Sequence, residues 1–255
     1  YEIGVRLVGS EMCIRDSRNP SSGFNQSRDG PPSFTVVTST VWPFLSGVCS
    51  GTMARQSAVR AQAAEFMQKA IRFASDTGIR VIQLAGYDVY YEPTTRESRQ
   101  RYLEGMHHAL EVAAQYQVTL ALEIMDTTFL NSISKYLVLK EQLASPWFQV
   151  YPDLGNLTAW GNDVVRELTL GINHIVGVHV KETKPVGPNF PGAFRDIAFG
   201  QGTVDFVTCF KTLHDLGYAG PFLVEMWTEK AVDPVKEIRS ARQWVGERMT
   251  QGGYV

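Results

Sequence analysis

The sequence predicts an α/β fold of the (β/α)8 TIM barrel type, and three observations support this prediction. Apolar strand-like runs alternate with amphipathic stretches from residue 58 to the end, which requires parallel strands joined by crossover helices. Metal-ligating residue types stand near the ends of four successive apolar runs, as expected where barrel strands meet at one face. Only the last five βα units are recognisable, so the barrel is expected to be incomplete at its N-terminus. An open doubly wound sheet is the alternative.

Composition and charge exclude several classes of protein. The 255 residues are 44% hydrophobic, which suits a globular core, and their formal net charge is -2. This charge argues against a nucleic-acid partner, and neither a membrane span nor a signal peptide is predicted. We therefore expect a cytoplasmic protein with a small-molecule partner and no membrane association, which could form a homodimer. The three widely spaced cysteines are expected to be reduced thiols.

The first 57 residues differ in character from the rest of the chain. Residues 1–56 contain no lysine and are rich in Ser, Gly and Pro. Residues 5–17 look like a translated sequencing adapter, and the part that follows could be out-of-frame coding sequence. We expect an atypical leader at 1–57 and the C-terminal part of a barrel domain at 58–255. A natural flexible leader is the alternative.

Strands are predicted from short apolar runs, and helices from apolar residues that recur at three- and four-residue spacing. The strands are expected at 79–86, 117–125, 148–153, 175–180 and 222–227. The helices are expected at 59–74, 94–113, 132–143, 163–170, 206–216 and 233–249. The connection of about twenty residues after the fourth strand is longer than most, which predicts a functional lid.

Local signals predict where several helices begin and end. Gly78 and Gly217 are suitable C-terminal stops. The tetrapeptide TTRE at 94–97 is typical of a capping box that begins a helix. Asp205, and the pair formed by Asp233 and a following proline, predict the starts of the last two helices.

Four residues near strand ends stand out as a set, and a carboxylate buried in an apolar strand must be paired, metal-bound or catalytic. The four are Glu123, Asp153, His179 and Glu225. Three carboxylates and one imidazole suit a divalent cation such as Mn²⁺, Mg²⁺ or Co²⁺, with Zn²⁺ also compatible. Each residue taken alone could be an ordinary polar residue at a strand end, but the repetition over successive strands favours a metal centre.

Two glutamates on one metal suggest proton transfer. A divalent cation acidifies the α C–H of a bound hydroxyketone because it stabilises the developing enediolate. One glutamate can remove the proton and the other can return it from the opposite face, which inverts one carbon. Return of the proton to the neighbouring carbon would instead give aldose-ketose isomerisation, and residue spacing cannot separate the two outcomes.

Six segments of the predicted barrel domain carry longer motifs. They are GIRVIQLAGYDVYY at 78–91, LEIMD at 122–126, NSISK at 131–135, YPDLGNL at 151–157, VHVKETK at 178–184 and VEMW at 224–227. These motifs resemble the bacterial L-ribulose-5-phosphate 3-epimerases, also called L-xylulose-5-phosphate 3-epimerases, of ascorbate catabolism. The resemblance covers residues 58–255, and the family's first three strands have no recognisable counterpart in residues 1–56.

The resemblance implies a xylose isomerase-like barrel and an isomerase that interconverts L-ribulose 5-phosphate and L-xylulose 5-phosphate through a metal-bound enediolate. It implies that Glu123, Asp153, His179 and Glu225 hold the divalent metal and that Glu123 and Glu225 are the acid/base pair. Related epimerases of unphosphorylated ketoses carry histidine at the position of Asn156, which tilts the substrate toward a phosphopentulose.

Two further features of the sequence could contact the substrate. Lys181 shares a strand face with His179 and could neutralise an enediolate oxygen or the phosphate, while an ordinary solvated lysine is an equal alternative. Gly200-Gln201-Gly202 could present backbone N–H groups to phosphate, although an ordinary turn is the preferred interpretation.

Three alternative functions stay open at this point. The first is an aldose-ketose or hydroxypyruvate-type isomerase of the same barrel class. The second is an inactive truncated fragment. The third is a barrel endonuclease acting on damaged DNA, which would need more metal-binding histidines and a basic face.

Overall fold

The structure is a computed structural model that describes residues 11–14, 57–90 and 92–254. Most of the predicted leader at 1–57 lies outside the described residues. The chain divides into two units. Of the described residues, 57–90, 92–152 and 174–176 form the β2–β4 unit, and 11–14, 153–173 and 177–254 form the β5–β6 unit.

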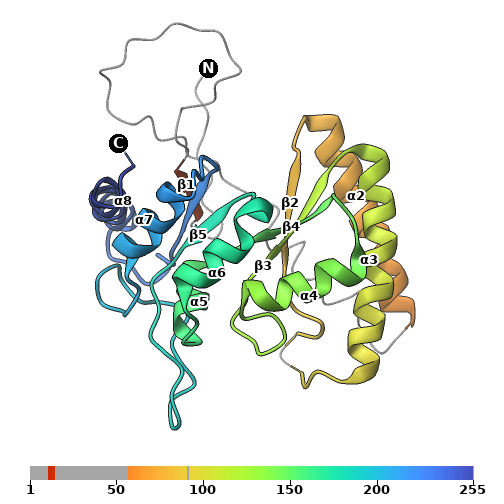
Figure 1. The fold of residues 1–255 in the computed structure, drawn as a ribbon, viewed down its shortest axis with the longest axis horizontal. Helices are drawn as coiled ribbons and strands as arrows, with labels where there is room; N and C mark the ends of the chain where they lie inside the picture. Colours follow the sequence, from red (N-terminus) through yellow and green to blue (C-terminus); the bar gives the residue numbers. More distant parts are fainter. Residues whose placement is uncertain (1–10, 15–56, 91, 255) are drawn as a thin grey trace, which may run out of the picture. The chain divides into compact units, whose positions relative to one another are not determined.

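The β2–β4 unit alternates helix and strand, as the sequence predicts. Its elements are α2 (Ser57–Thr77), β2 (Val81–Ala85), α3 (Arg96–Tyr116), β3 (Thr119–Glu123), α4 (Ile133–Leu143) and β4 (Phe148–Tyr151). The strands pair in the order β2-β3-β4, and both pairs are parallel. Figure 1 shows the three helices lying outside this sheet.

Strand residues of both parities are buried in the β2–β4 unit. Leu120, Ala121 and Leu122 are fully buried although neighbouring side chains point to opposite faces of β3. Such continuous burial is typical of parallel strands that are covered on both faces. Each fully buried leucine stabilises the folded state by about 1.5–3 kcal/mol relative to a leucine left exposed to water.

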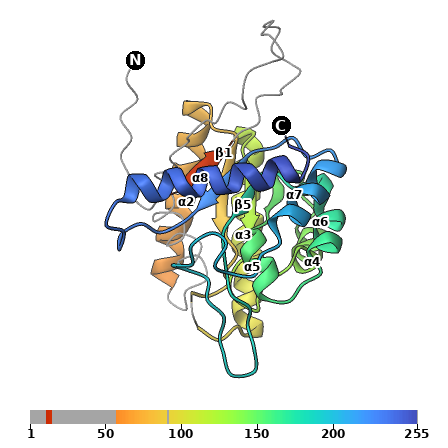
Figure 2. The same cartoon turned by 90° about the vertical axis from the view of Figure 1, so that its left-hand side faces the viewer.

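The β5–β6 unit holds a second three-stranded sheet. Its elements are β1 (Glu11–Ile14), α5 (Leu154–Ala159), α6 (Val164–Gly171), β5 (Val178–Val180), α7 (Phe206–Asp215), β6 (Phe222–Glu225) and α8 (Pro234–Gln251). A short 3-10 helix (Ile172–His174) spans the change from one unit to the other. The sheet order is β1-β6-β5, with β5 and β6 parallel. Figure 2 shows α8 as a long helix with α7 beside it.

Strand β1 was not predicted from the sequence, and it pairs with β6 in the antiparallel sense. Its register places Glu11 opposite Glu225 and Ile14 opposite Phe222. The outer edge of a strand offers backbone N–H and C=O groups to any extended segment, so such pairing needs no side-chain pattern. Periodicity in the sequence therefore could not indicate it.

Most predicted helix boundaries agree with the structure. Asp205 and Asp233 are N-caps, each accepting a backbone N–H through Oδ1 at 3.0 Å. Gly78 and Gly217 have φ values of 80° and 75°, which a residue with a side chain rarely adopts.

Two details of the local predictions were wrong. The capping box of α3 is formed by Thr95 and Ser98 rather than by residues 94 and 97. Thr94 instead donates a hydrogen bond to the buried Asp88 at 2.9 Å, which holds the preceding loop against the helix start. Helix α5 was not predicted, because Leu154–Ala159 is too short for a helical period to be recognised.

The helices pack one face against the sheets. Phe206, Cys209 and Phe210 lie on the buried face of α7. Burial raises the pKa of the Cys209 thiol to about 12. None of the helices in the described part of the chain combines the length and the hydropathy that crossing a membrane requires.

The long connection between β5 and α7 begins as a small hairpin. Antiparallel bridges join Lys184 with Ala193 and Gly187 with Phe190. The backbone N–H of Val186 donates to the carbonyl of Ala159 at 2.8 Å, which ties the hairpin to the end of α5. Its predicted role as a lid stays a prediction.

Candidate metal centre

Three of the predicted ligands meet inside the β5–β6 unit because of its strand register. Strands β5 and β6 are parallel with His179 opposite Leu223, so Glu225 follows two residues later at the C-terminal end of β6. An isolated parallel bridge pairs Asp153 with His179. Local backbone pairing thus brings the three side chains to the same strand ends.

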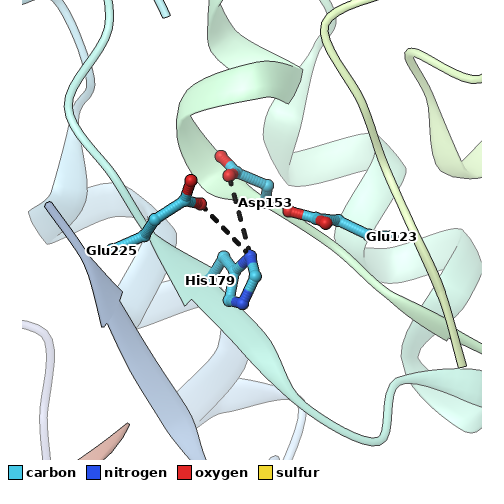
Figure 3. A group of neighbouring side chains, drawn as sticks. All are labelled: Glu123, Asp153, His179 and Glu225. Atoms are coloured by element: carbon cyan, nitrogen blue, oxygen red, sulfur yellow. Dashed lines mark ion pairs between the residues drawn. The ribbon is translucent and has the colours of Figure 1, made fainter. Parts of the chain in front are cut away.

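The distances among these side chains are short. Nδ1 of His179 lies 3.4 Å from Oε2 of Glu225 and 3.9 Å from Oδ2 of Asp153 (Figure 3). One ligand atom of each residue lies within 4.8 Å of those of the other two. All three residues are buried. Nitrogen and oxygen atoms that converge in this way can coordinate one cation.

The two carboxylate oxygens of Asp153 have different roles: one caps a helix, and the other faces the proposed ligands. Oδ1 accepts the backbone N–H of Asn156 at 2.8 Å and so caps helix α5. Oδ2 is the oxygen that faces His179. The N-cap fixes the side chain, so the direction of Oδ2 is set by the helix start.

A buried lysine completes the cluster. Nζ of Lys181 lies 2.8 Å from Oδ2 of Asp153 and 3.3 Å from Oε2 of Glu225. The segment that carries Lys181 is fixed against α5, because Thr183 donates a hydrogen bond to the carbonyl of Gly155 at 2.8 Å. A Cβ at Gly155 would lie 2.5 Å from the carbonyl oxygen of Lys181, so this approach requires glycine.

Burial has the largest effect on the pKa of Asp153. Loss of water around the carboxylate raises the pKa of Asp153 to about 6, against the attraction of the Lys181 ammonium, which lowers it. The nearby Glu225 carboxylate raises the pKa further, and His179 lowers it. A positive charge among these oxygens therefore favours the carboxylate form.

Glu123 ends strand β3 in the β2–β4 unit and is fully buried. Its Oε2 accepts a hydrogen bond from the side-chain amide of Gln83 at 2.9 Å. Gln83 lies on the neighbouring strand β2, opposite Ala121. Ala121 and Glu123 are two residues apart on β3, so the side chains of Gln83 and Glu123 point to the same face of the sheet. In the register of β3 and β4, Glu123 is opposite Tyr151, two residues before Asp153 in the chain.

The donor set in the β5–β6 unit fits a divalent cation. Oδ2 of Asp153 and Oε2 of Glu225 are buried, and both face the ammonium of Lys181 and the imidazole of His179. Each carboxylate oxygen has two lone pairs, so both keep acceptor capacity for a metal ion. Carboxylate oxygens with one imidazole suit Mn²⁺, Mg²⁺, Co²⁺ or Zn²⁺.

The two predicted substrate-contact residues lie close to this cluster. Asn156 is buried in the first turn of α5, three residues after Asp153. Lys181 is within the cluster itself. Gln83 was not singled out from the sequence, because a strand glutamine gives no periodic or motif signal until its partner is known.

Glu182 is a further residue that sequence reasoning missed. Its Oε2 accepts the N–H of Gly200 at 2.9 Å, and its Oε1 accepts the N–H of Val204 at 3.2 Å. The N–H of Gly200 belongs to the turn at 200–202 that could present backbone N–H groups to phosphate, and the N–H of Val204 lies just after this turn. A carboxylate of the same chain bonds to both groups, which favours the ordinary-turn interpretation.

The sequence matches a known family. The pattern described as xylose isomerase-like TIM barrel covers residues 36–248. The chain belongs to this family, and its fold is the (β/α)8 barrel of the xylose isomerase-like type. The expected boundary between leader and barrel domain at residue 57 stays a prediction.

Two relatives from Escherichia coli make the relationship more specific. SgbU of strain K12, whose name assigns it provisionally to the L-ribulose-5-phosphate 3-epimerases, is 56% identical over 226 residues, which are 89% of this chain and 76% of SgbU. The L-ribulose-5-phosphate 3-epimerase UlaE of strain E24377A is 56% identical over 198 residues, which are 78% of this chain and 68% of UlaE. The chain is therefore an isomerase of the epimerase class.

Solved structures share the fold at low sequence identity. A structure described as L-ribulose 3-epimerase has a TM-score of 0.64 and 21% identity over 80% of this chain and 73% of its own. A xylose isomerase domain protein from Planctomyces limnophilus has a TM-score of 0.63 and 19% identity over 82% of this chain and 72% of its own.

Proposed function

We propose that the chain is a metal-dependent 3-epimerase that interconverts L-ribulose 5-phosphate and L-xylulose 5-phosphate. The observation that carries the proposal is the buried cluster of Asp153, His179 and Glu225 at the strand ends of a barrel. The names of relatives that are 56% identical support the choice of substrate. The presence of Asn156 three residues after Asp153 supports a phosphorylated pentulose, as expected from the sequence.

The metal would be held by Asp153, His179, Glu225 and Glu123. Glu123 is included because it is opposite Tyr151 in the parallel register, close in the chain to Asp153, and because it is a buried carboxylate. When bound, a divalent cation supplies Lewis acidity that makes the proton on C3 of the ketose easier to remove.

Glu123 and Glu225 are the proposed proton carriers. One carboxylate removes the proton from C3, and the other returns a proton to C3 from the opposite face, so the configuration at C3 inverts. Gln83 fixes Oε2 of Glu123 by its hydrogen bond. Burial of both glutamates excludes bulk water, which would otherwise compete for the proton.

Asn156 and Lys181 are the proposed substrate contacts. Both are buried beside Asp153, and both offer donors that suit hydroxyl, enediolate or phosphate oxygens. The partner is accordingly a small phosphosugar. A homodimer and a cytoplasmic location remain predictions from the sequence.

Exchange of the C3 proton with solvent tests the assignment. In D₂O, the protein should incorporate deuterium at C3 of L-ribulose 5-phosphate and form L-xylulose 5-phosphate, which NMR follows directly. Glu123→Gln and Glu225→Gln should each slow this exchange by roughly 10²-fold to 10⁴-fold, because each removes one proton carrier.

Matched controls separate catalysis from general charge effects. Glu141→Gln and Glu229→Gln remove exposed glutamates and should leave exchange unchanged. Metal content is measured for every variant, because Glu225 is also a proposed ligand. Undiminished exchange in both Glu123→Gln and Glu225→Gln would remove the basis of the proposed mechanism.

The remaining functional alternatives are decided by the products. Formation of an aldose would indicate an aldose-ketose isomerase of the same barrel class. Metal binding without any exchange or product would indicate an inactive chain.

A further inference from the structure

A buried lysine shares the carboxylate oxygens of the candidate metal centre. Nζ of Lys181 lies 2.8 Å from Oδ2 of Asp153 and 3.3 Å from Oε2 of Glu225. Nδ1 of His179 faces the same two oxygens. The ammonium and the imidazole therefore share the same two carboxylate oxygens, both of which are proposed ligand atoms.

The position of Lys181 balances charge that would otherwise be unfavourable. Asp153 is fully buried, and Glu225 and Lys181 are also buried. Carboxylates removed from water are costly unless a cation or hydrogen-bond donors offset their charge. In the structure the Lys181 ammonium is within ion-pair distance of both carboxylates.

A divalent cation would compete with this ammonium. Two positive charges that approach the same oxygens repel each other, and the repulsion is strong where water is excluded. The ring centroid of Trp227 lies 5.8 Å from Nζ of Lys181, which gives the ammonium an electron-rich contact besides the carboxylates. The guanidinium of Arg195 lies 5.5 Å from the same ring centroid.

We propose that Lys181 is an internal counter-cation of the metal centre. It neutralises Asp153 and Glu225 in the metal-free protein, and it moves away from Oδ2 and Oε2 when a divalent cation binds. The inference rests on the proposed function only in taking this cluster as the metal site. It differs from a role in substrate contact, because it predicts effects in the absence of any substrate.

Metal affinity and thermal stability of the full chain test the proposal. Lys181→Met should bind Mn²⁺ roughly tenfold or more tightly than the wild type in isothermal titration calorimetry, because the competing charge is gone. The same variant without metal should have a Tm lower by about 5–10 °C, because two buried carboxylates lose their cation. With saturating Mn²⁺, the difference in Tm between Lys181→Met and the wild type should become smaller.

Lys184→Met is the matched control. Lys184 is an exposed lysine in the same segment, three residues further on, so its removal should change neither the Mn²⁺ affinity nor the Tm. Lys181→Gln is a second neutral variant, more polar than methionine, with the same expected direction of change. The inference is overturned if both neutral variants bind Mn²⁺ no more tightly than the wild type.

Folding failure and loss of metal binding have distinct meanings. If both neutral variants fail to fold even with Mn²⁺ present, the proposal is overturned, because the metal should replace the lost charge. If Mn²⁺ binds to none of the proteins, wild type included, the metal centre itself is wrong and the proposed function fails with it. If Mn²⁺ binds tightly and with equal affinity to all the proteins, the counter-cation proposal is wrong but the metal centre is not contradicted.

Discussion

At the scale of single residues, hydrogen bonds to backbone and to neighbouring side chains fix the direction of the functional groups. Asp153 is held by the start of α5, and Glu123 is held by Gln83. A carboxylate that is free to rotate would sample many positions, so each fixed contact reduces the reorganisation that a reaction requires. Gln83 should therefore act as a positioning residue.

Gln83→Leu should lower the kcat of epimerisation by roughly 10-fold to 100-fold, because a hydrogen bond to a charged group contributes about 1.5–3 kcal/mol. The KM should stay within about twofold, since substrate contacts are unchanged. Steady-state kinetics with L-ribulose 5-phosphate gives both values. Gln149→Leu is the control, because Gln149 is a strand glutamine whose amide bonds to the carbonyl of Pro146 instead. Equal losses in the two variants would show that Gln83 has no special role.

The sequence predicted which residue types matter more readily than it predicted their partners. The carboxylates and the histidine stand out because polar groups in apolar strands need compensation. Gln83 and Glu182 gave no comparable signal, because their roles depend on atoms that lie far away in the chain. Lys181 was predicted to contact substrate, and its approach to Asp153 could be found only in three dimensions.

At the scale of elements, one carboxylate closes the long connection between β5 and α7. Glu182 accepts N–H groups from Gly200 and Val204, which are 18 and 22 residues further along the chain. Gly202 packs so closely that a Cβ there would overlap Oε1 of Glu182. The end of the connection is thus tied to the residue that follows Lys181.

Glu182→Gln should loosen this closure. The substituted amide keeps one acceptor oxygen but turns N–H groups toward backbone N–H groups, so at least one bond is lost. Hydrogen exchange of peptides covering residues 199–206 should accelerate by roughly 10-fold to 100-fold, as measured by mass spectrometry. Glu237→Gln, at an exposed position of α8, should leave those peptides unchanged. Unchanged exchange in the Glu182 variant would mean that the loop is held by other contacts.

The element order was predictable because the strands from β2 to β6 and most helices have a periodic or capping signal. The five strands from β2 to β6 all lie within the predicted ranges. The ends of the strands were less predictable, since β5 covers only Val178–Val180 of the strand predicted at 175–180. Strand β1 and helix α5 depend on backbone pairing and on one N-cap, which periodicity does not reveal.

At the scale of the whole molecule, the proposed metal should contribute to stability. A ligand that binds only the folded chain raises the free energy of unfolding by about 2.7 kcal/mol when its concentration is 100 times its Kd. For a chain of this size that corresponds to a rise in Tm of roughly 5–10 °C. We expect MnCl₂ to produce this rise in a calorimetric scan and EDTA to reverse it.

A pair of capping aspartates provides the control for this prediction. Asp153 caps α5 and Asp163 caps α6, each accepting a backbone N–H through Oδ1. Asparagine is an equally good N-cap, so Asp153→Asn and Asp163→Asn should both keep their helices. Only Asp153→Asn should lose the stabilisation by Mn²⁺. Equal stabilisation of both variants would exclude Asp153 as a ligand.

The contact between Gly155 and the segment of Lys181 links two short pieces of sequence that lie far apart in the chain. One piece is DLGN at 153–156, and the other is KET at 181–183. Thr183 bonds to the carbonyl of Gly155, and no larger residue fits at 155. A designer who transplants this pocket to another barrel must therefore move both pieces together. Either piece grafted alone would meet a host residue of the wrong size, and the spacing of the polar groups would be lost.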